Sequence, residues 1–207
     1  MTSTTALDDA AARALDDPAA AISSLPWLEA SLADDAAAGR FAAWGRSTVI
    51  DENVGEAVIP RPLFDELHER AGLEATWPVG NAGLLHVYGY LLSTTPTPYG
   101  LKRERWLSGE LERACGLEVG ALLPWAGTET LLARATAVAS ALLARADAVT
   151  EVAEGRTARI ALGTPAPGGT AALAYAVDGR IVTIFPVADP AALRAGLGAP
   201  RLRWNAA

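Results

Sequence analysis

The spacing of hydrophobic residues predicts helices throughout the first third of the chain. The stretch from Leu7 to Ile22 is rich in alanine, and Pro18 should divide it into two helical pieces. A longer helix is predicted from Pro26 to about Arg40, because a proline in the first turn is compatible with helix geometry. A short helix should follow over residues 62–71 and end at a glycine.

The hydrophobic pattern changes along the second half of the chain. Apolar residues at 131, 132, 135, 138, 139, 142 and 143 fall on one side of a helix. After residue 148 the pattern takes the period of strands, in four short runs separated by turns at Gly155, at PAPGG and at Asp178-Gly179. The runs ALAYAV and IVTIF are apolar on both faces, which indicates central strands covered by helices. Asp189 should cap a final helix.

These elements together predict an α+β fold. We expect an antiparallel sheet of five or six strands, packed against several helices, in which the last four strands form a C-terminal meander. The length of 207 residues suits a single domain over 1–207. Within it, residues 1–72 form the helical N-terminal third and residues 73–207 form the mixed α+β remainder.

The segment LLHVYGYLL, residues 84–92, is predicted to be a strand with an unusual face. With a period of two residues, His86, Tyr88 and Tyr90 would all point to the same side. A row of one titratable ring and two phenols on an apolar strand indicates that something polar is held there. This row is the strongest functional signal in the sequence.

The segment LKRERWL, residues 101–107, is predicted to pair with this strand. The intervening STTPTPYG contains two prolines and a glycine and therefore forms a loop, so the two segments would make a hairpin with a long connection. In the return strand, Lys102 and Trp106 would lie on one face, and Arg103 and Arg105 on the other. The sequence leaves open which of these faces lies beside the row of aromatic residues.

A hairpin of this composition would provide an aromatic surface with cationic donors, which suits a small anionic ligand. Histidine can act as an acid or base near neutral pH, a phenol can donate to a developing oxyanion, and lysine or arginine can hold a carboxylate, phosphate or sulfate. The predicted catalytic residues are His86, Tyr88 and Lys102. The predicted substrate-binding residues are Tyr90, Thr94, Tyr99, Arg103, Arg105, Trp106 and, from the glycine-containing WPVGNAG, Asn81.

A structural interpretation of the same residues stays open. Tyrosine and histidine are often half-buried with one satisfied polar end, and alternating charges often mark a solvated edge strand. The cluster Asp51-Glu52-Asn53 could bind a cation or act as a base, but a solvent-exposed acidic turn is the preferred interpretation. His68 follows Phe64 by one helical turn and is interpreted as a residue at the edge of the core.

Composition excludes several other classes of function. The net charge of −7 argues against a general affinity for nucleic acid or an anionic membrane. Cys115 is the only cysteine, so a cysteine zinc site is excluded, and the two histidines lack metal-ligand spacing. We predict no metal and no cofactor. The sequence predicts neither a signal peptide nor a membrane span, and a cytoplasmic location is expected.

Two functions remain in play. The first is a small-molecule enzyme of the lyase, cyclase or hydrolase type, using acid–base chemistry on an anionic substrate, in a setting such as specialised metabolism. The second is a non-catalytic ligand-binding or accessory subunit, which would form a homodimer or pair with a partner protein. Loss of turnover without loss of stability on replacing His86 would favour the enzyme.

Overall fold

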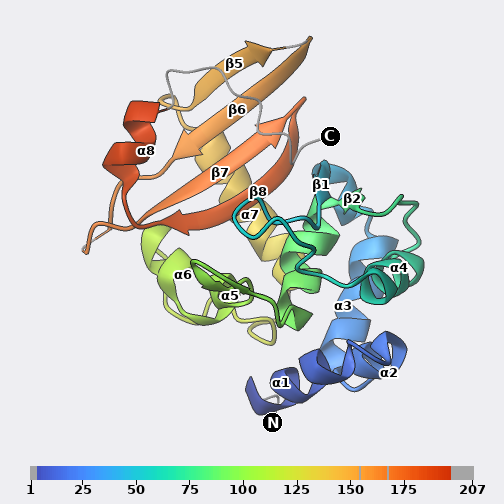
Figure 1. Ribbon diagram of the computed structural model, residues 1–207. Helices are drawn as coiled ribbons and strands as arrows, with labels where there is room; N and C mark the ends of the chain where they lie inside the picture. The colour runs from blue at the N-terminus through green and yellow to red at the C-terminus, as the bar shows by residue number, and fades with distance from the viewer. Residues whose placement is uncertain (1–3, 154, 167, 197–207) are drawn as a thin grey trace.

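In a computed structural model that describes residues 4–153, 155–166 and 168–196, the chain forms an α+β fold (Figure 1). The helices are α1 (Thr4–Arg13), α2 (Pro18–Ser23), α3 (Pro26–Ala37), α4 (Arg61–Arg70), α5 (Glu104–Leu107), α6 (Glu110–Ala114), α7 (Leu131–Leu143) and α8 (Pro190–Gly196). Shorter helical segments are the 3₁₀ turns η1 (Arg40–Ala43) and η3 (Gly89–Leu92) and the π-helical turn η2 (Leu84–Tyr88). The strands are β1 (Arg46–Thr48), β2 (Val79–Asn81), β3 (Pro96–Thr97), β4 (Gly100–Leu101), β5 (Val149–Ala153), β6 (Arg156–Leu162), β7 (Ala171–Val177) and β8 (Arg180–Val187).

The predicted C-terminal meander is confirmed. Strands β5, β6, β7 and β8 form one sheet in chain order, and each neighbouring pair is antiparallel. Asp178 and Gly179 make the tight turn between β7 and β8 with φ angles of 50° and 77°, as their residue types predict. The prediction of five or six strands in one sheet is wrong, because β1–β2 and β3–β4 form two separate two-stranded sheets.

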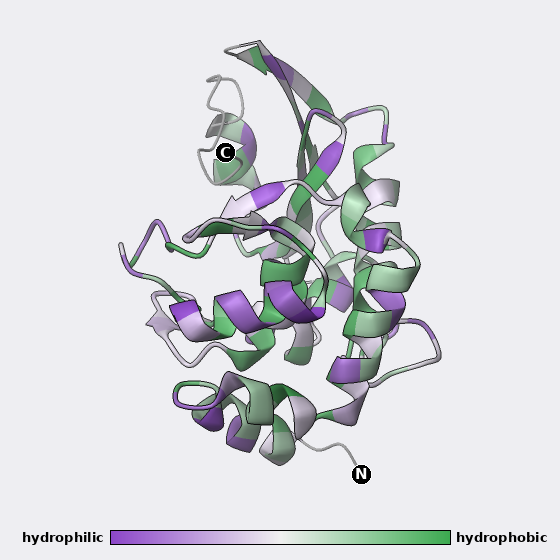
Figure 2. Ribbon diagram, turned by 90° about the vertical axis from the view of Figure 1, so that its right-hand side faces the viewer, coloured by the Kyte–Doolittle hydropathy of each residue, from purple (hydrophilic) through white to green (hydrophobic). Residues whose placement is uncertain are grey.

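Helix α7 covers one face of the four-stranded sheet. Ala172 and Ala174 of β7 point towards it and belong to the main hydrophobic core. The side chain of Arg159, on β6, donates to the carbonyl oxygens of Leu143 and Arg145 at 2.6 and 3.1 Å, which satisfies free acceptors at the end of α7. Seen from the side, the sheet stands edge-on above the N-terminal helices (Figure 2).

The N-terminal helices follow the sequence prediction closely. Pro18 begins α2, so α1 and α2 are separate helices, and the carboxylate of Asp17 accepts from the N–H of Ala20 as the N-cap of α2. Helix α3 begins at Pro26, as predicted. Trp44 and Gly45 then join this region to the sheet: Gly45 N–H donates to the carbonyl of Ile181 at 2.8 Å.

The predicted strand over residues 84–92 is wrong, because this segment is helical. Residues 82–83 begin a helix that continues as η2 and η3, and the carboxamide oxygen of Asn81 accepts from the N–H of Leu84 at its start. The segment lies in the centre of the main core, where a helix satisfies its own backbone groups. Its four leucines and single β-branched residue also fit a helix better than a strand.

The predicted return strand over residues 101–107 is also wrong. Only Gly100 and Leu101 pair with β3, and the chain then turns into α5. The carbonyl of Lys102 accepts from the N–H of Arg105 in that turn, at 3.4 Å. The hairpin expected between 84 and 107 is therefore replaced by a central helix, a two-residue hairpin and a short helix.

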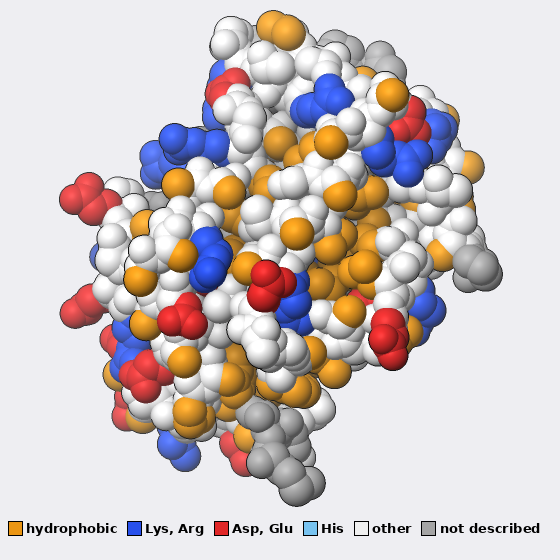
Figure 3. All heavy atoms as spheres, turned by 180° about the vertical axis from the view of Figure 1, so that it is seen from behind, with side chains coloured by type: hydrophobic (Ala, Val, Ile, Leu, Met, Phe, Trp, Pro, Cys, Tyr) orange, Lys and Arg blue, Asp and Glu red, His pale blue; other side chains and the backbone are white. Residues whose placement is uncertain are grey.

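The surface carries both signs of charge. On the face seen from behind, hydrophobic side chains gather near the middle, and basic and acidic side chains are spread around them (Figure 3). Among the helices of the described residues, none has both the length and the apolar character needed to cross a membrane.

Candidate functional site

Four of the predicted site residues meet around the ring of Tyr90. The rings of His86 and Tyr90 are stacked, with centroids 4.8 Å apart and an interplanar angle of 25°. The Nζ atom of Lys102 lies 5.7 Å from the centre of the Tyr90 ring, and the Cζ atom of Arg105 lies 5.2 Å from it. We call His86, Tyr90, Lys102 and Arg105 the Tyr90 cluster.

Helical geometry explains why these four residues meet although the predicted hairpin does not exist. His86 and Tyr90 are four residues apart, so they lie on the same side of the central helical segment. Lys102 and Arg105 are three residues apart across the turn into α5, so they also point to one side. The sequence prediction placed these two cations on opposite faces of a strand, and that placement is wrong.

His86 is held as a neutral ring. Its Nε2 atom lies 3.0 Å from the hydroxyl of Ser47, and its backbone carbonyl accepts from the indole N–H of Trp106 at 2.9 Å. The Nδ1 atom makes no hydrogen bond within the described residues. Burial, together with the positive charges of Arg105 and Lys102, holds the pKa of His86 well below its usual range.

Lys102 forms an ion pair with Asp51, which lies in the loop after β1. The other oxygen of this carboxylate accepts from the N–H groups of Asn53 and Val54 at 2.9 and 3.2 Å. Burial raises the pKa of Asp51, but the bonds from Lys102 and from these N–H groups outweigh it, so the pKa is lowered. The interpretation of a solvent-exposed acidic turn is wrong for Asp51, which is buried, whereas Glu52 and Asn53 are exposed.

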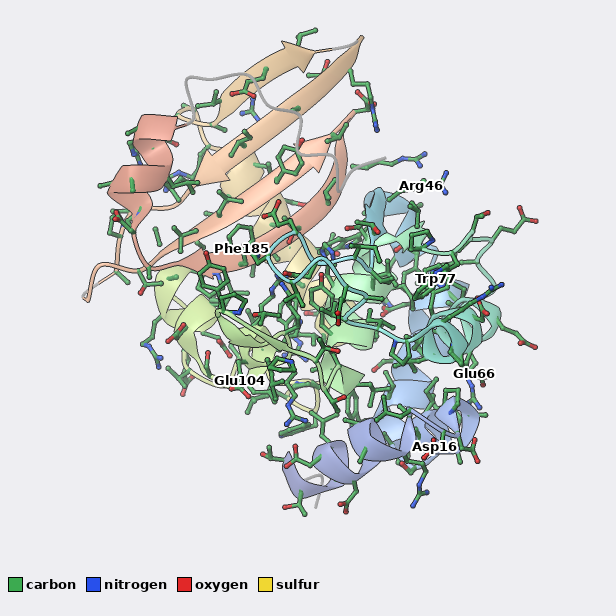
Figure 4. All side chains as sticks on the ribbon, viewed as in Figure 1. Asp16, Arg46, Glu66, Trp77, Glu104 and Phe185 are labelled. Carbon is green, nitrogen blue, oxygen red and sulfur yellow. The ribbon has the colours of Figure 1, made fainter. Side chains whose placement is uncertain are left out.

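Arg105 differs from Lys102 because no carboxylate of the described residues lies within ion-pair distance of it. Its guanidinium donates to the hydroxyl of Thr183 at 3.2 Å, and its Cζ atom lies 5.6 Å from the centre of the Phe185 ring. Phe185 projects from β8 towards the segment that carries α5 and α6 (Figure 4). The half-buried guanidinium is thus held between two aromatic rings, and burial lowers its pKa.

Tyr90 joins these groups without being charged. It is buried, and burial raises the pKa of its phenol to about 12, although the charge of Arg105 acts in the opposite direction. The phenol is therefore protonated at neutral pH. It can donate a hydrogen bond to an anion but cannot add a negative charge to the site.

Tyr88 lies outside the cluster, contrary to the prediction of a shared face. Its hydroxyl donates to the carboxylate of Asp35 at 2.5 Å, and that carboxylate also accepts from Thr130 at 2.6 Å and from Arg40 at 2.9 Å. Asp35 is fully buried, so this network connects α3, the central helical segment and the start of α7. The role of Tyr88 in the structure is to support the core.

Three other predicted ligand residues have structural partners elsewhere. The side chain of Asn81 donates to the carbonyl of Phe41 at 3.0 Å and caps the central helical segment. Arg103 forms an ion pair with Asp8 of α1 at 2.8 Å. Trp106 is fully buried and anchors the backbone of His86.

The two predicted rim residues are exposed, and the second histidine is buried. Thr94 and Tyr99 lie on the surface beside β3 and β4, and Tyr99 is 81% exposed. His68 accepts from the N–H of Asn81 at 3.2 Å, and its Nδ1 atom lies 2.7 Å from the carbonyl of Phe64. Burial lowers the pKa of His68, so it is a neutral residue of the core and not an edge residue.

Sequence reasoning missed the residues that complete the cluster from other elements. Ser47 belongs to β1, and Thr183 and Phe185 belong to β8, so they lie far from residues 84–107 in the chain. No local pattern marks them. The alternation in β8 could only have shown that Thr183 and Phe185 share a face, because their pairing with Arg105 is a tertiary contact.

The cluster contains the kinds of group that anion binding and proton transfer require. Arg105 supplies a cation with unused donors, Tyr90 supplies a protonated phenol, and His86 supplies a neutral imidazole. Within the residues that the structure describes, no group of three or more His, Cys, Asp or Glu side chains could hold a metal ion.

Comparison with known proteins gives no identity for the chain. It matches no protein-family model, no curated protein and no solved structure.

Proposed function

We propose that the protein is a small-molecule enzyme that binds an anionic substrate at the Tyr90 cluster. Arg105 binds the anion, and the protonated phenol of Tyr90 and the imidazole of His86 serve the acid–base steps of a lyase, cyclase or hydrolase reaction. Lys102, paired with Asp51, positions the loop after β1 against the cluster. The reaction requires no cofactor in this proposal.

The observation that carries the proposal is the environment of Arg105. A guanidinium has five N–H donors, and placing it away from water costs free energy unless these donors find partners. Arg105 has one described side-chain acceptor, Thr183, and two aromatic rings. None of its nitrogen atoms is among the buried side-chain atoms without a partner, so the remaining donors are open to an anionic ligand, which would replace water as their acceptor and supply the opposite charge.

The neutral His86 defines what kind of acid–base role it can have. With a lowered pKa, the ring is a weak base that stays neutral in the resting protein. Binding of an anion would partly cancel the repulsion from Arg105, and the imidazolium form would become less unfavourable. The substrate itself would therefore prepare His86 to accept a proton.

A thermal-shift screen with carboxylates, phosphates and sulfates tests binding. A ligand of this site should stabilise the wild type, by about 2.7 kcal/mol at a concentration a hundredfold above its Kd. Arg105→Gln should abolish the stabilisation. Arg103→Gln is the matched control, because Arg103 lies in the same segment but pairs with Asp8, and it should retain the ligand effect.

Turnover of the stabilising ligand is then followed by NMR with His86→Gln and Tyr90→Phe. Tyr90→Phe keeps the ring contacts and removes only the hydroxyl. Each variant should lose turnover by about 10²-fold or more and still be stabilised by the ligand. Equal loss of the ligand effect in Arg103→Gln and Arg105→Gln would contradict the proposal.

Surface features favour a second candidate, a non-catalytic subunit that pairs with a partner protein. Tyr99 is 81% exposed, and hydrophobic side chains gather around a hollow on the face shown in Figure 3. Exposed apolar side chains of this kind are typical of contact surfaces. For this candidate, the ligand that stabilises the wild type is bound but never consumed, and Tyr99→Ala weakens association measured by ultracentrifugation.

A further inference from the structure

We propose that the group bound by Arg105 is a monoanionic carboxylate and not a phosphate dianion. This inference rests on the proposed function of the Tyr90 cluster and assigns its substrate class. It follows from the sum of charges in the cluster and from the way the guanidinium is held.

The cluster contains two cations but only one uncompensated positive charge. The ammonium of Lys102 is paired with the buried carboxylate of Asp51, and that carboxylate is fixed by two further N–H donors from its own loop. Arg105 is the cation without a carboxylate partner among the described residues. The cluster as a whole therefore matches one negative charge.

The remaining titratable groups do not change this sum. Burial and the neighbouring cations hold the pKa of His86 below its usual range, and burial raises the pKa of Tyr90 to about 12. Both side chains are neutral at neutral pH. A ligand with two negative charges would bring one charge that nothing in the cluster balances, and an unbalanced charge in a partly buried site is costly.

The contacts of Arg105 also suit a ligand group that presents two oxygen atoms. The rings of Tyr90 and Phe185 approach the guanidinium at 5.2 and 5.6 Å, and Thr183 takes one of its donors. The donors that remain lie in the plane of the guanidinium. Two oxygens of a carboxylate match such a pair of donors in a bidentate contact, and two oxygens of a phosphate can do the same, so the charge of the ligand and not its shape separates the two groups.

The head group can be tested with three probes of similar size: acetate, methanesulfonate and methyl phosphate. At about pH 8 methyl phosphate is a dianion, because its second pKa is near 6, and the other two are monoanions. Dissociation constants are measured by NMR at constant ionic strength, from the Nε–H resonance of Arg105. That resonance is assigned by its absence from Arg105→Gln. Acetate should bind most tightly, at least about tenfold more tightly than methyl phosphate.

Asp51→Asn provides the sharpest test, because it adds one positive charge to the cluster. The amide oxygen can still accept from Asn53 and Val54, whereas Lys102 loses its counter-charge. The ratio of the acetate Kd to the methyl phosphate Kd should therefore rise at least about tenfold. Glu56→Gln is the matched control, since it makes the same change of charge at an exposed position of the same loop and should leave the ratio unchanged.

The outcomes separate this inference from the proposed function. If none of the probes binds, or if none perturbs Arg105, the proposed site itself is wrong. If methyl phosphate or methanesulfonate binds the wild type as tightly as acetate, the anion site at Arg105 is supported but the assignment of a carboxylate is wrong. If Asp51→Asn leaves the ratio unchanged, the charge argument behind the assignment is wrong.

Discussion

Tyr88 and Tyr90 are two residues apart and have opposite surroundings. The hydroxyl of Tyr88 is bound to a buried carboxylate, while the ring of Tyr90 is in contact with two cations. Burial and the neighbouring charge of Asp35 raise the pKa of Tyr88 far above its usual value. The two phenols therefore serve stability and the candidate site respectively, although both resemble site residues in the sequence.

Tyr88→Phe should separate these two roles. The change removes a hydrogen bond to a charged group and leaves Asp35 with Thr130 and Arg40 as partners. We expect the free energy of unfolding to fall by about 1.5–3 kcal/mol, measured by urea denaturation, with no change in the Kd of a ligand bound at Arg105. A weaker ligand affinity together with an unchanged free energy of unfolding would show that Tyr88 takes part in ligand binding.

The two buried histidines should make the folded state sensitive to mild acid. An unfolded histidine takes up a proton near pH 6.5, whereas His68 and His86 have lowered pKa values when folded. The unfolded chain therefore binds more protons as the pH falls through about 6.5. Stability should be complete above that value and decrease below it, until the pH reaches the folded pKa values.

Urea denaturation between about pH 7.5 and about pH 5.5 measures this effect. Each histidine can contribute a slope of at most about 1.4 kcal/mol per pH unit, and His68→Gln and His86→Gln should each remove part of it. A free energy of unfolding that is constant or rises as the pH falls would show that neither histidine is held neutral.

At the scale of elements, the sequence predicted most segments whose pattern reflects one local environment. The split at Pro18, the α7 helix and the turn at Asp178-Gly179 depend on the neighbouring residues alone, and the structure confirms them. Residues 84–92 were different, because the whole segment is buried and the alternation of His86, Tyr88 and Tyr90 does not mark a solvent-exposed face that would distinguish a strand from a helix. The contacts of this segment with the rest of the core determine whether it forms a helix or a strand.

The candidate site was also predicted only in part. Two of the catalytic candidates, His86 and Lys102, and two of the ligand candidates, Tyr90 and Arg105, meet in the structure. The prediction used the wrong strand geometry, but residues four apart also share one side of a helix, so His86 and Tyr90 stay together while Tyr88 points elsewhere. The rest of the cluster comes from contacts between distant elements, which no single segment reveals.

The close packing of the central helical segment gives a prediction at Gly83. A Cβ atom there would come within 2.7 Å of the Trp44 ring and 2.9 Å of Leu132. Alanine favours helices by about 1 kcal/mol, but overpacking against a rigid ring costs about 1–3 kcal/mol. We therefore expect Gly83→Ala to lower the melting temperature.

Gly45→Ala is the control for this prediction. The nearest atoms to its added Cβ lie at 3.5 Å or more, which is ordinary contact, and its φ is not in the left-handed region. Its melting temperature should stay close to that of the wild type. If Gly83→Ala is equally stable, the close approach of Trp44 to this helix is wrong.

At the scale of the whole molecule, the contacts between the N-terminal helices and the C-terminal sheet indicate that the two parts form one unit. The indole of Trp44 donates to Thr136 of α7 at 2.8 Å, and Gly45 is bonded to β8. The buried apolar residues of α1, α2, α3 and α7, together with Ala172 and Ala174 of β7, belong to one hydrophobic cluster, while the other face of β7 contributes to a second, smaller cluster. A shared core predicts that both parts lose their structure together.

Calorimetry tests this expectation of one domain. Heating should give a single transition, with a calorimetric enthalpy equal to the van't Hoff enthalpy. The near-ultraviolet signal of the tryptophans and the far-ultraviolet signal of the backbone should change at the same temperature. Two transitions, or two different midpoints, would divide the chain into independent units.

The position of β8 in the chain also determines when, during synthesis, the surroundings of Arg105 can be completed. Ser47, Asp51 and the Tyr90 cluster are translated early, but Thr183 and Phe185 follow almost eighty residues after Arg105. A nascent chain stalled before this strand has the guanidinium without its hydrogen-bond acceptor Thr183 and without the ring of Phe185. If Arg105 binds the ligand as we propose, recognition requires a finished sheet, and an interrupted translation product would not compete for the ligand.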